Sequence, residues 1–254
     1  MSSFLANEAK GDWRNFKGDH YHIVYLVWSL LHETGRVAFY QGNDLLRQVP
    51  PPEKIGEDPQ ALPLTLRLQK SDEDEWIQLK AVQNSNWACT PVFRDLLANF
   101  LFNSLFSRSN SRNWSVKLVT ISPIDSAGIQ DFIARYASED SFPRLKPDFK
   151  KVVEEVVLRW NAENPQNPVT VDDIEQLGLA ILRQLALQTP LPLNELKLEC
   201  QVKLTELHPN KNKVQVILNT LSGALLEEAS KGPQAARFYD LSSHAKVIRY
   251  FVPT

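Results

Sequence analysis

Cysteine is scarce in this chain of 254 residues, which contains only Cys89 and Cys200. Neither belongs to a CxxC pair, and neither has a histidine partner nearby in the sequence. A zinc site and a disulfide framework are therefore excluded as organising features. So few thiols fit a protein of the reducing cytosol.

Long apolar runs are also missing. No stretch approaches the ~18 uncharged apolar residues that a membrane span requires, and the first residues contain no apolar signal region. We therefore expect a cytoplasmic protein that does not enter a membrane. The net charge is only −2, so the molecule as a whole has no positive field to attract nucleic acid. Any binding of DNA must then depend on a local patch.

Several common enzyme motifs do not occur. The sequence contains neither GxxxxGK[ST] nor GxGxxG, and it lacks GxSxG. Nucleotide binding through a phosphate loop and serine-hydrolase chemistry therefore have no support. With 43% hydrophobic and 23% charged residues, the chain can still bury a substantial core.

Hydrophobic periodicity predicts helices and strands in alternation through the first half of the chain. The helices are expected at 19–33, 92–106 and 129–136, and the strands at 36–40, 64–68, 75–82 and 114–121. An acidic turn at 71–74 joins the second and third strands into a hairpin, and the acidic run 73–75 is interpreted as solvated. This order predicts an α/β fold, with a mixed sheet flanked by helices.

The second half differs in character. Helices are expected at 148–161 and 171–188, and Thr170-x-x-Asp173 resembles a capping box that opens the latter. Apolar residues alternate with polar ones between 195 and 207, which predicts a half-buried strand paired with 214–218. We place a boundary within 138–147, so that residues 1–140 form the core. Residues 141–254 would then form a C-terminal α+β extension, of helices and a β-hairpin, with an assembly or regulatory role.

One strand carries the residues of greatest chemical interest. Side chains alternate along a strand, so Trp76, Gln78 and Lys80 should share one face. Upstream, Asp44 follows the strand predicted at 36–40, at a point where a sheet can fork. The sequence therefore predicts an acid on one strand opposite an amide and a lysine on another.

This combination suits phosphodiester hydrolysis. The reaction needs a hard cation held by oxygen ligands, which stabilises charge on the phosphate and lowers the pKa of the attacking water. Asp44 would supply the anionic ligand, with the Gln78 side-chain carbonyl and the Leu79 main-chain carbonyl as further ligands. Lys80 would orient the water or stabilise the transition state.

Plainer interpretations remain open for the same residues. The tripeptide 78–80 alone fits an amphipathic strand with a solvated face, and Asp44 alone fits a turn. Asp19 is either a second carboxylate ligand or the N-cap of the first helix, and we favour the cap.

Basic side chains also follow the helix predicted at 92–106. Arg108, Arg112 and Lys117 lie among serines and asparagines. They are DNA-contact candidates if this segment touches phosphates, and otherwise they belong to a solvated linker.

Two runs of sequence together resemble a known family. GND at 42–44 precedes QLK at 78–80, after a first helix that opens Gly-Asp-x-Tyr-His. This arrangement resembles the PD-(D/E)XK nuclease superfamily. Within it the chain looks like the double-stranded-DNA nuclease domains of bacterial anti-phage effectors, which are fused to cyclic-nucleotide sensors or partnered with HerA-type ATPases. The W-x-C-T segment before Val92 and the run WSVKLVTIS share the likeness, which covers roughly residues 17–135.

The resemblance implies a restriction-endonuclease-like fold and a DNA endonuclease that depends on Mg²⁺ or Mn²⁺. It also implies a role in antiviral defence, a homo-oligomer, and an ATPase or sensor as partner. Two departures weaken the metal site: Gln78 stands where an acid is usual, and Gln41 stands where related sequences often have glutamate.

Two other hypotheses follow from what the site lacks. The chain could be a nuclease-like fold that has lost catalysis and binds DNA or a partner subunit. It could also be a structural or regulatory subunit in which residues 148–254 assemble rings or dock on an ATPase.

Overall fold

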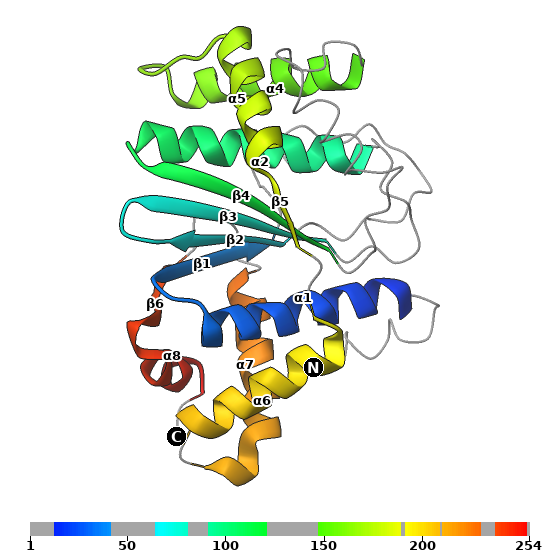
Figure 1. Cartoon of the computed structure of the whole chain (residues 1–254), viewed down its shortest axis with the longest axis vertical. Coiled ribbons are helices and arrows are strands. Elements are labelled where there is room, and N and C mark those ends of the chain that lie inside the picture. The colour runs from blue at the N-terminus through cyan, green and yellow to red at the C-terminus, as the bar shows by residue number, and fades with distance from the viewer. Residues whose placement is uncertain are drawn as a thin grey trace. The chain divides into compact units, whose positions relative to one another are not determined.

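The computed structural model describes residues 13–41, 64–80, 91–120, 147–188, 191–208, 210–229 and 237–252. In this part of the chain it confirms the predicted α/β class, because six strands form one mixed sheet with helices beside it (Figure 1). The strand order is β5-β4-β3-β2-β1-β6. The strands β4 and β5 run parallel, whereas β1 and β6 run antiparallel.

The element bounds agree with most of the sequence-based expectations. The strands are β1 (Arg36–Gln41), β2 (Leu64–Gln69), β3 (Glu73–Lys80), β4 (Asn113–Thr120), β5 (Ala186–Gln188) and β6 (Tyr239–Asp240). The helices are α1 (Trp13–His32), α2 (Pro91–Ser109), α4 (Pro147–Glu163), α5 (Val171–Gln184), α6 (Leu193–Leu207), α7 (Val214–Ala229) and α8 (His244–Phe251), with 3-10 turns η2 (Lys211–Lys213) and η4 (Leu241–Ser243). The helix predicted at 129–136 lies outside the described residues.

Contacts divide the chain into two compact units. The first contains residues 1–66, 79–83 and 189–254, and the second contains 67–78 and 84–188. The helices α4 and α5, which follow the boundary predicted at 138–147, belong to the same unit as α2 and β4. The assignment of separate roles to residues 1–140 and 141–254 stays a prediction.

The first unit is built around α1, which packs against α6 and α7. Its apolar residues are buried on nearly all sides, as with Val27 and Leu31. The Tyr21 hydroxyl donates to the Leu191 carbonyl at 3.3 Å, and the Trp28 indole N–H donates to Glu199 on α6. These bonds satisfy the polar atoms of aromatic rings that the helix buries.

The start of α1 corrects one expectation. The helix begins at Trp13, well before Asp19, so the interpretation of Asp19 as its N-cap is wrong. The side chain of Asp19 lies outside the described part of the structure. Its alternative role as a metal ligand therefore stays a prediction.

The hairpin predicted in the C-terminal extension is wrong, because both of its strands are helical. Residues 193–207 form α6, and residues 214–229 form α7. An alternating pattern also contains residues spaced by four, which lie on one face of a helix. Helix α6 uses that second spacing: it buries Leu196, Cys200 and Leu204 and leaves Leu198 and Val202 exposed.

Cys200 lies in the core of the first unit. Its side chain is fully buried, and its thiol lies 3.9 Å from the Val24 carbonyl oxygen. Burial, with the nearby charge of Glu199, raises the pKa of the thiol to about 12. A thiol with such a pKa is unreactive at neutral pH, so Cys200 serves as a small apolar core residue.

In the second unit, α2 packs against β4, α4 and α5. The Phe102 ring meets the Trp160 ring of α4 edge to face, with centroids 5.3 Å apart. The predicted capping box is confirmed: the Asp173 amide donates to the Thr170 hydroxyl, and the Thr170 amide donates to the Asp173 carboxylate. Helix α5 ends at Gln184, earlier than expected, because the next residues pair with β4 as β5.

No helix in the described ranges is long and apolar enough to span a membrane.

Candidate functional site

The three predicted catalytic residues are described to different extents. Asp44 lies outside the described residues, and Lys80 ends β3 with its side chain outside the described part. Gln78 is described in full. Alternation along β3 gives Gln78 the same face of the strand as Trp76. The prediction that the QLK motif lies on a strand is confirmed. The prediction that Asp44 lies close to this strand stays a prediction.

Gln78 is the residue of this face that most needs an explanation. Its side chain has no exposed surface, and neither its amide oxygen nor its amide nitrogen has a hydrogen-bond partner among the described residues. A solvated strand face is therefore the wrong interpretation for Gln78. Leaving a buried polar group unsatisfied costs roughly 1–3 kcal/mol, and such groups are uncommon in folded proteins.

At the other end of β3, Asp74 is the centre of a buried ionic network. Its side chain has no exposed surface. Oδ2 accepts hydrogen bonds from Arg67 Nη2 and from the Ser107 hydroxyl, both at 2.7 Å, and Oδ1 accepts from Arg112 Nε at 3.0 Å. Burial alone would raise the pKa of Asp74, but the bonds from Arg67 and Ser107 and the charge of Arg67 lower it. The carboxylate is therefore ionised.

Aromatic rings enclose this network. The Arg67 guanidinium lies 5.1 Å from the centre of the Trp76 ring and 5.0 Å from that of Phe106. The Trp76 indole N–H donates to the Ser107 hydroxyl at 2.9 Å. Because Ser107 in turn donates to Asp74, β2, β3 and α2 are joined through one set of bonds.

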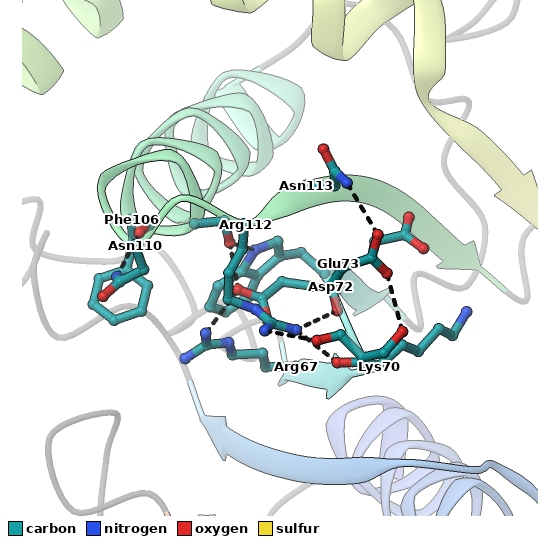
Figure 2. A network of polar contacts seen from close by, with 12 residues as sticks. Arg67, Lys70, Asp72, Glu73, Phe106, Asn110, Arg112 and Asn113 are labelled. Atoms are coloured by element: carbon teal, nitrogen blue, oxygen red, sulfur yellow. Dashed lines mark hydrogen bonds and ion pairs between the residues drawn. The ribbon is translucent and has the colours of Figure 1, made fainter.

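Arg112 fastens the turn between β2 and β3 (Figure 2). Beyond its bond to Asp74, its guanidinium donates to the main-chain carbonyls of Lys70, Ser71 and Glu73. The Lys70 amide also donates to the Glu73 carbonyl at 2.9 Å, which closes the hairpin. All of these hydrogen bonds join groups of this chain to one another, so they stabilise its fold.

Glu75 forms a second cluster on the opposite face of β3. It pairs with Lys117 on β4 and with Lys70, whose Nζ lies 3.0 Å from Oε2. Burial would raise the pKa of Glu75, but the bonds from Lys117 and Lys70 outweigh it and lower the pKa. Asp74 and Glu75 are thus each paired with bases of the same unit.

The three DNA-contact candidates differ in their ion pairs and in their exposure. Arg112 and Lys117 are held in ion pairs with Asp74 and Glu75. Arg108 is exposed in the last turn of α2. A contact with DNA phosphates stays a prediction for all three, and for Arg112 and Lys117 it would compete with these pairs.

Sequence reasoning missed the buried role of the acidic run. Asp74 is fully buried and Glu75 is 8% exposed, so the interpretation of residues 73–75 as a solvated turn is wrong. Cross-strand register was the available signal. The hairpin bond between Lys70 and Glu73 places Arg67 close to Asp74 and Trp76 on the partner strand.

The predicted metal site can be compared with the described residues only in part. In the described ranges, no three His, Cys, Asp or Glu side chains lie close enough to hold one. Gln78 Oε1 is a buried oxygen without a partner there, and the Leu79 carbonyl is a ligand of the same hard type that Mg²⁺ takes. Binding of a metal ion by Asp44, Gln78 and the Leu79 carbonyl stays a prediction.

No protein-family model and no curated protein matches this chain. Solved structures that resemble it include the Cap4 SAVED/CARF-domain containing receptor of Acinetobacter baumannii with the cyclic trinucleotide 3'3'3'-cAAA. The identity is 14%, the match covers 91% of this chain and 47% of the receptor, and the TM-score is 0.42. For the Cap4 receptor of Moraxella osloensis the identity is 12%, the coverage is 91% and 47%, and the TM-score is 0.41.

This chain therefore spans about half the length of the receptors that it matches. At such TM-scores the likeness says nothing about the activity of this chain.

Proposed function

We propose that this chain is a metal-dependent endonuclease that hydrolyses phosphodiester bonds of DNA. Asp44 and Gln78 would hold Mg²⁺ or Mn²⁺ together with the Leu79 carbonyl, and Lys80 would act as the catalytic lysine. The proposal combines the sequence resemblance with the environment of one side chain.

That side chain is Gln78. A strand side chain that only fills the core would be apolar, because an unpaired amide costs stability. Gln78 is fully buried, has an unpartnered amide oxygen among the described residues, and stands two residues before Lys80 on β3. A carbonyl oxygen in this position is suited to ligate a cation, and a lysine beside it is suited to the charge of a phosphate.

Each residue has a distinct task in the proposed site. The bound cation would lower the pKa of water and offset charge on the phosphate. Asp44 would supply the negative charge that the neutral amide of Gln78 lacks. Lys80 would hold the attacking water or the phosphate oxygens through its ammonium hydrogens.

The biological setting is inferred from the sequence resemblance. We expect the enzyme to act on DNA in bacterial antiviral defence, as a homo-oligomer with an ATPase or sensor partner. The partner is expected from the family likeness alone.

Plasmid cleavage tests the activity. The purified chain is incubated with supercoiled plasmid in Mg²⁺, in Mn²⁺ and in EDTA, and nicked and linear products are followed over time. Products that appear with metal and disappear in EDTA are expected. Intact plasmid in both metals, over a range of protein concentrations, would count against the chain's being a nuclease on its own.

The neutral residue at position 78 supports one alternative, a nuclease-like subunit that binds DNA or a partner without cleaving. A glutamine ligand attracts a cation less strongly than glutamate does. Retention of the plasmid in a gel without any cleavage would favour that alternative over the nuclease.

A further inference from the structure

Helix α2 turns a row of polar side chains toward the sheet. Asn103, Ser104 and Ser107 are at most 5% exposed, in a helix whose neighbouring residues are apolar. Ser107 is satisfied by Trp76 and Asp74. The amide nitrogen of Asn103 and the hydroxyl of Ser104 have no partner among the described residues.

The bonds of Ser107 fix how α2 lies over β3. They join the end of the helix to Asp74 and Trp76, the residues of β3 on the same face as Gln78. The main-chain N–H of Asn113 donates to the main-chain carbonyl of Asp72. The strands β3 and β4 therefore begin at the same edge of the sheet. Helix α2 links these strands and therefore runs opposite to β3, with its last turn at the hairpin (Figure 1).

Because α2 and β3 run in opposite directions, Gln78 lies level with the polar side chains of α2. Two residues along a strand advance about 6.6 Å, and one helical turn advances about 5.4 Å. One step along β3 from Trp76 leads to Gln78, and one turn back along α2 from Ser107 leads to Asn103 and Ser104. By this spacing Gln78 lies level with Asn103 and Ser104, and all three belong to those residues of the second unit whose buried polar atoms lack a partner among the described residues.

Their chemistry selects a neutral ligand. The unpartnered atoms are two amide nitrogens, one amide oxygen and one hydroxyl, and none carries a charge. An ion or a phosphate would need a charged partner in such a buried position. A water molecule needs two to four polar partners, which these atoms provide.

We infer that Gln78, Asn103 and Ser104 enclose an internal water site between β3 and α2. The water accepts hydrogen bonds from Gln78 Nε2 and Asn103 Nδ2 and donates one to the Ser104 hydroxyl oxygen. This arrangement uses the nitrogen end of the Gln78 amide and leaves Oε1 available as an acceptor. The further consequence, that Oε1 is thereby presented to the cation, rests on the proposed nuclease function.

Double-mutant cycles on the whole chain, in the absence of metal, test the water site. Gln78→Leu is combined with Ser104→Ala and, separately, with Asn103→Leu, and the unfolding equilibrium constant of each variant is measured in urea. If one water joins the three residues, their effects are coupled by about fivefold or more in that constant. Additive effects in both cycles would overturn the inference.

Ser29 provides a matched control. It is a buried serine on α1 whose hydroxyl also lacks a partner among the described residues. The cycle of Gln78→Leu with Ser29→Ala is expected to be additive. Coupling of the same size there would show that the effect is not specific to α2, and would overturn the water site.

A crystal structure of the wild-type chain at high resolution supplies a second test, which does not depend on any variant folding. One ordered water within hydrogen-bond distance of Gln78, Asn103 and Ser104 is expected. Direct bonds between these side chains with no water would refute the site.

These outcomes separate the two proposals. A coupled cycle with a wild type that never cleaves DNA keeps the water site and removes the nuclease. An active wild type with additive cycles does the reverse. If both hold, Asn103→Leu should weaken Mn²⁺ binding severalfold, because the Gln78 amide would lose its fixed orientation.

Discussion

Asp74→Ala is expected to destabilise the fold more than any other single substitution in the hairpin. Removing one partner of a buried ion pair costs roughly 3–5 kcal/mol, because the other charge stays buried and unpaired. The side chains of Arg67 and Arg112 retain 12% and 19% exposure, so we expect a loss near the lower limit, about 3 kcal/mol. Urea unfolding followed by tryptophan fluorescence measures the change.

Asp72→Ala is the matched control for this loss. Asp72 lies in the same turn but is exposed, and its side chain bonds with Ser71 and Asn113. We expect a change within about 0.5 kcal/mol, as for most surface substitutions. If Asp72→Ala lowered the free energy of unfolding as much as Asp74→Ala, burial of the ionic network would add no stability of its own.

Arg112→Lys is expected to behave as a disruptive substitution. The guanidinium donates to the Asp74 carboxylate and to three main-chain carbonyls at once. A lysine ammonium is a compact group with three donors and cannot reproduce this planar arrangement.

The same network predicts a loss of stability in acid. The folded-state pKa values of Asp74 and Glu75 lie below the ordinary values of 3.8 and 4.5. Their contribution to stability is therefore fully present above the ordinary values and is lost as the pH falls through the lowered ones. We expect the free energy of unfolding to fall below about pH 4, and to fall less steeply in Asp74→Asn. Equal slopes for the variant and the wild type would contradict this role.

The sequence predicted β3 well because its pattern is local. Alternate residues of the strand face opposite sides, and the turn before it is marked by charged residues. Alternation alone did not predict the burial of Asp74, because its partners are Arg67 across the hairpin and Arg112, which is far away along the chain. From sequence alone, a run of acidic residues is predicted to be exposed, because the bases that pair with it are not known.

Helix α6 shows a different limit. The alternation from Leu196 to Leu204 satisfies both a strand and one helical face, and local sequence cannot separate the two. Burial separates them: a strand would bury Leu198 and Val202 on the same face as Cys200, whereas α6 leaves both of them exposed. The strand that carries Gln78 was predictable, but the complete burial of its side chain was not, because burial depends on parts of the chain that pack on the strand from elsewhere in the sequence.

Lys80→Ala and Asp44→Ala are each expected to abolish DNA cleavage while the fold stays intact. Loss of a group that acts on the transition state lowers the rate by about a thousandfold, equivalent to roughly 4 kcal/mol of activation free energy. Lys80 is the last residue of β3, so truncating its side chain leaves the strand and the buried Leu79 in place. Initial rates of plasmid nicking in Mg²⁺, beside thermal unfolding of each variant, measure both effects.

Lys150→Ala controls for the loss of a positive charge. Lys150 is an exposed residue of α4, where it pairs with Glu154 at 3.7 Å, and it should retain the wild-type rate. Lys80→Arg should not restore activity, because the broad guanidinium cannot replace a point charge at one water or phosphate oxygen. Wild-type cleavage by Lys80→Ala would remove this residue from the proposed site. Loss of activity together with a lowered unfolding temperature would instead assign Lys80 to the fold of β3.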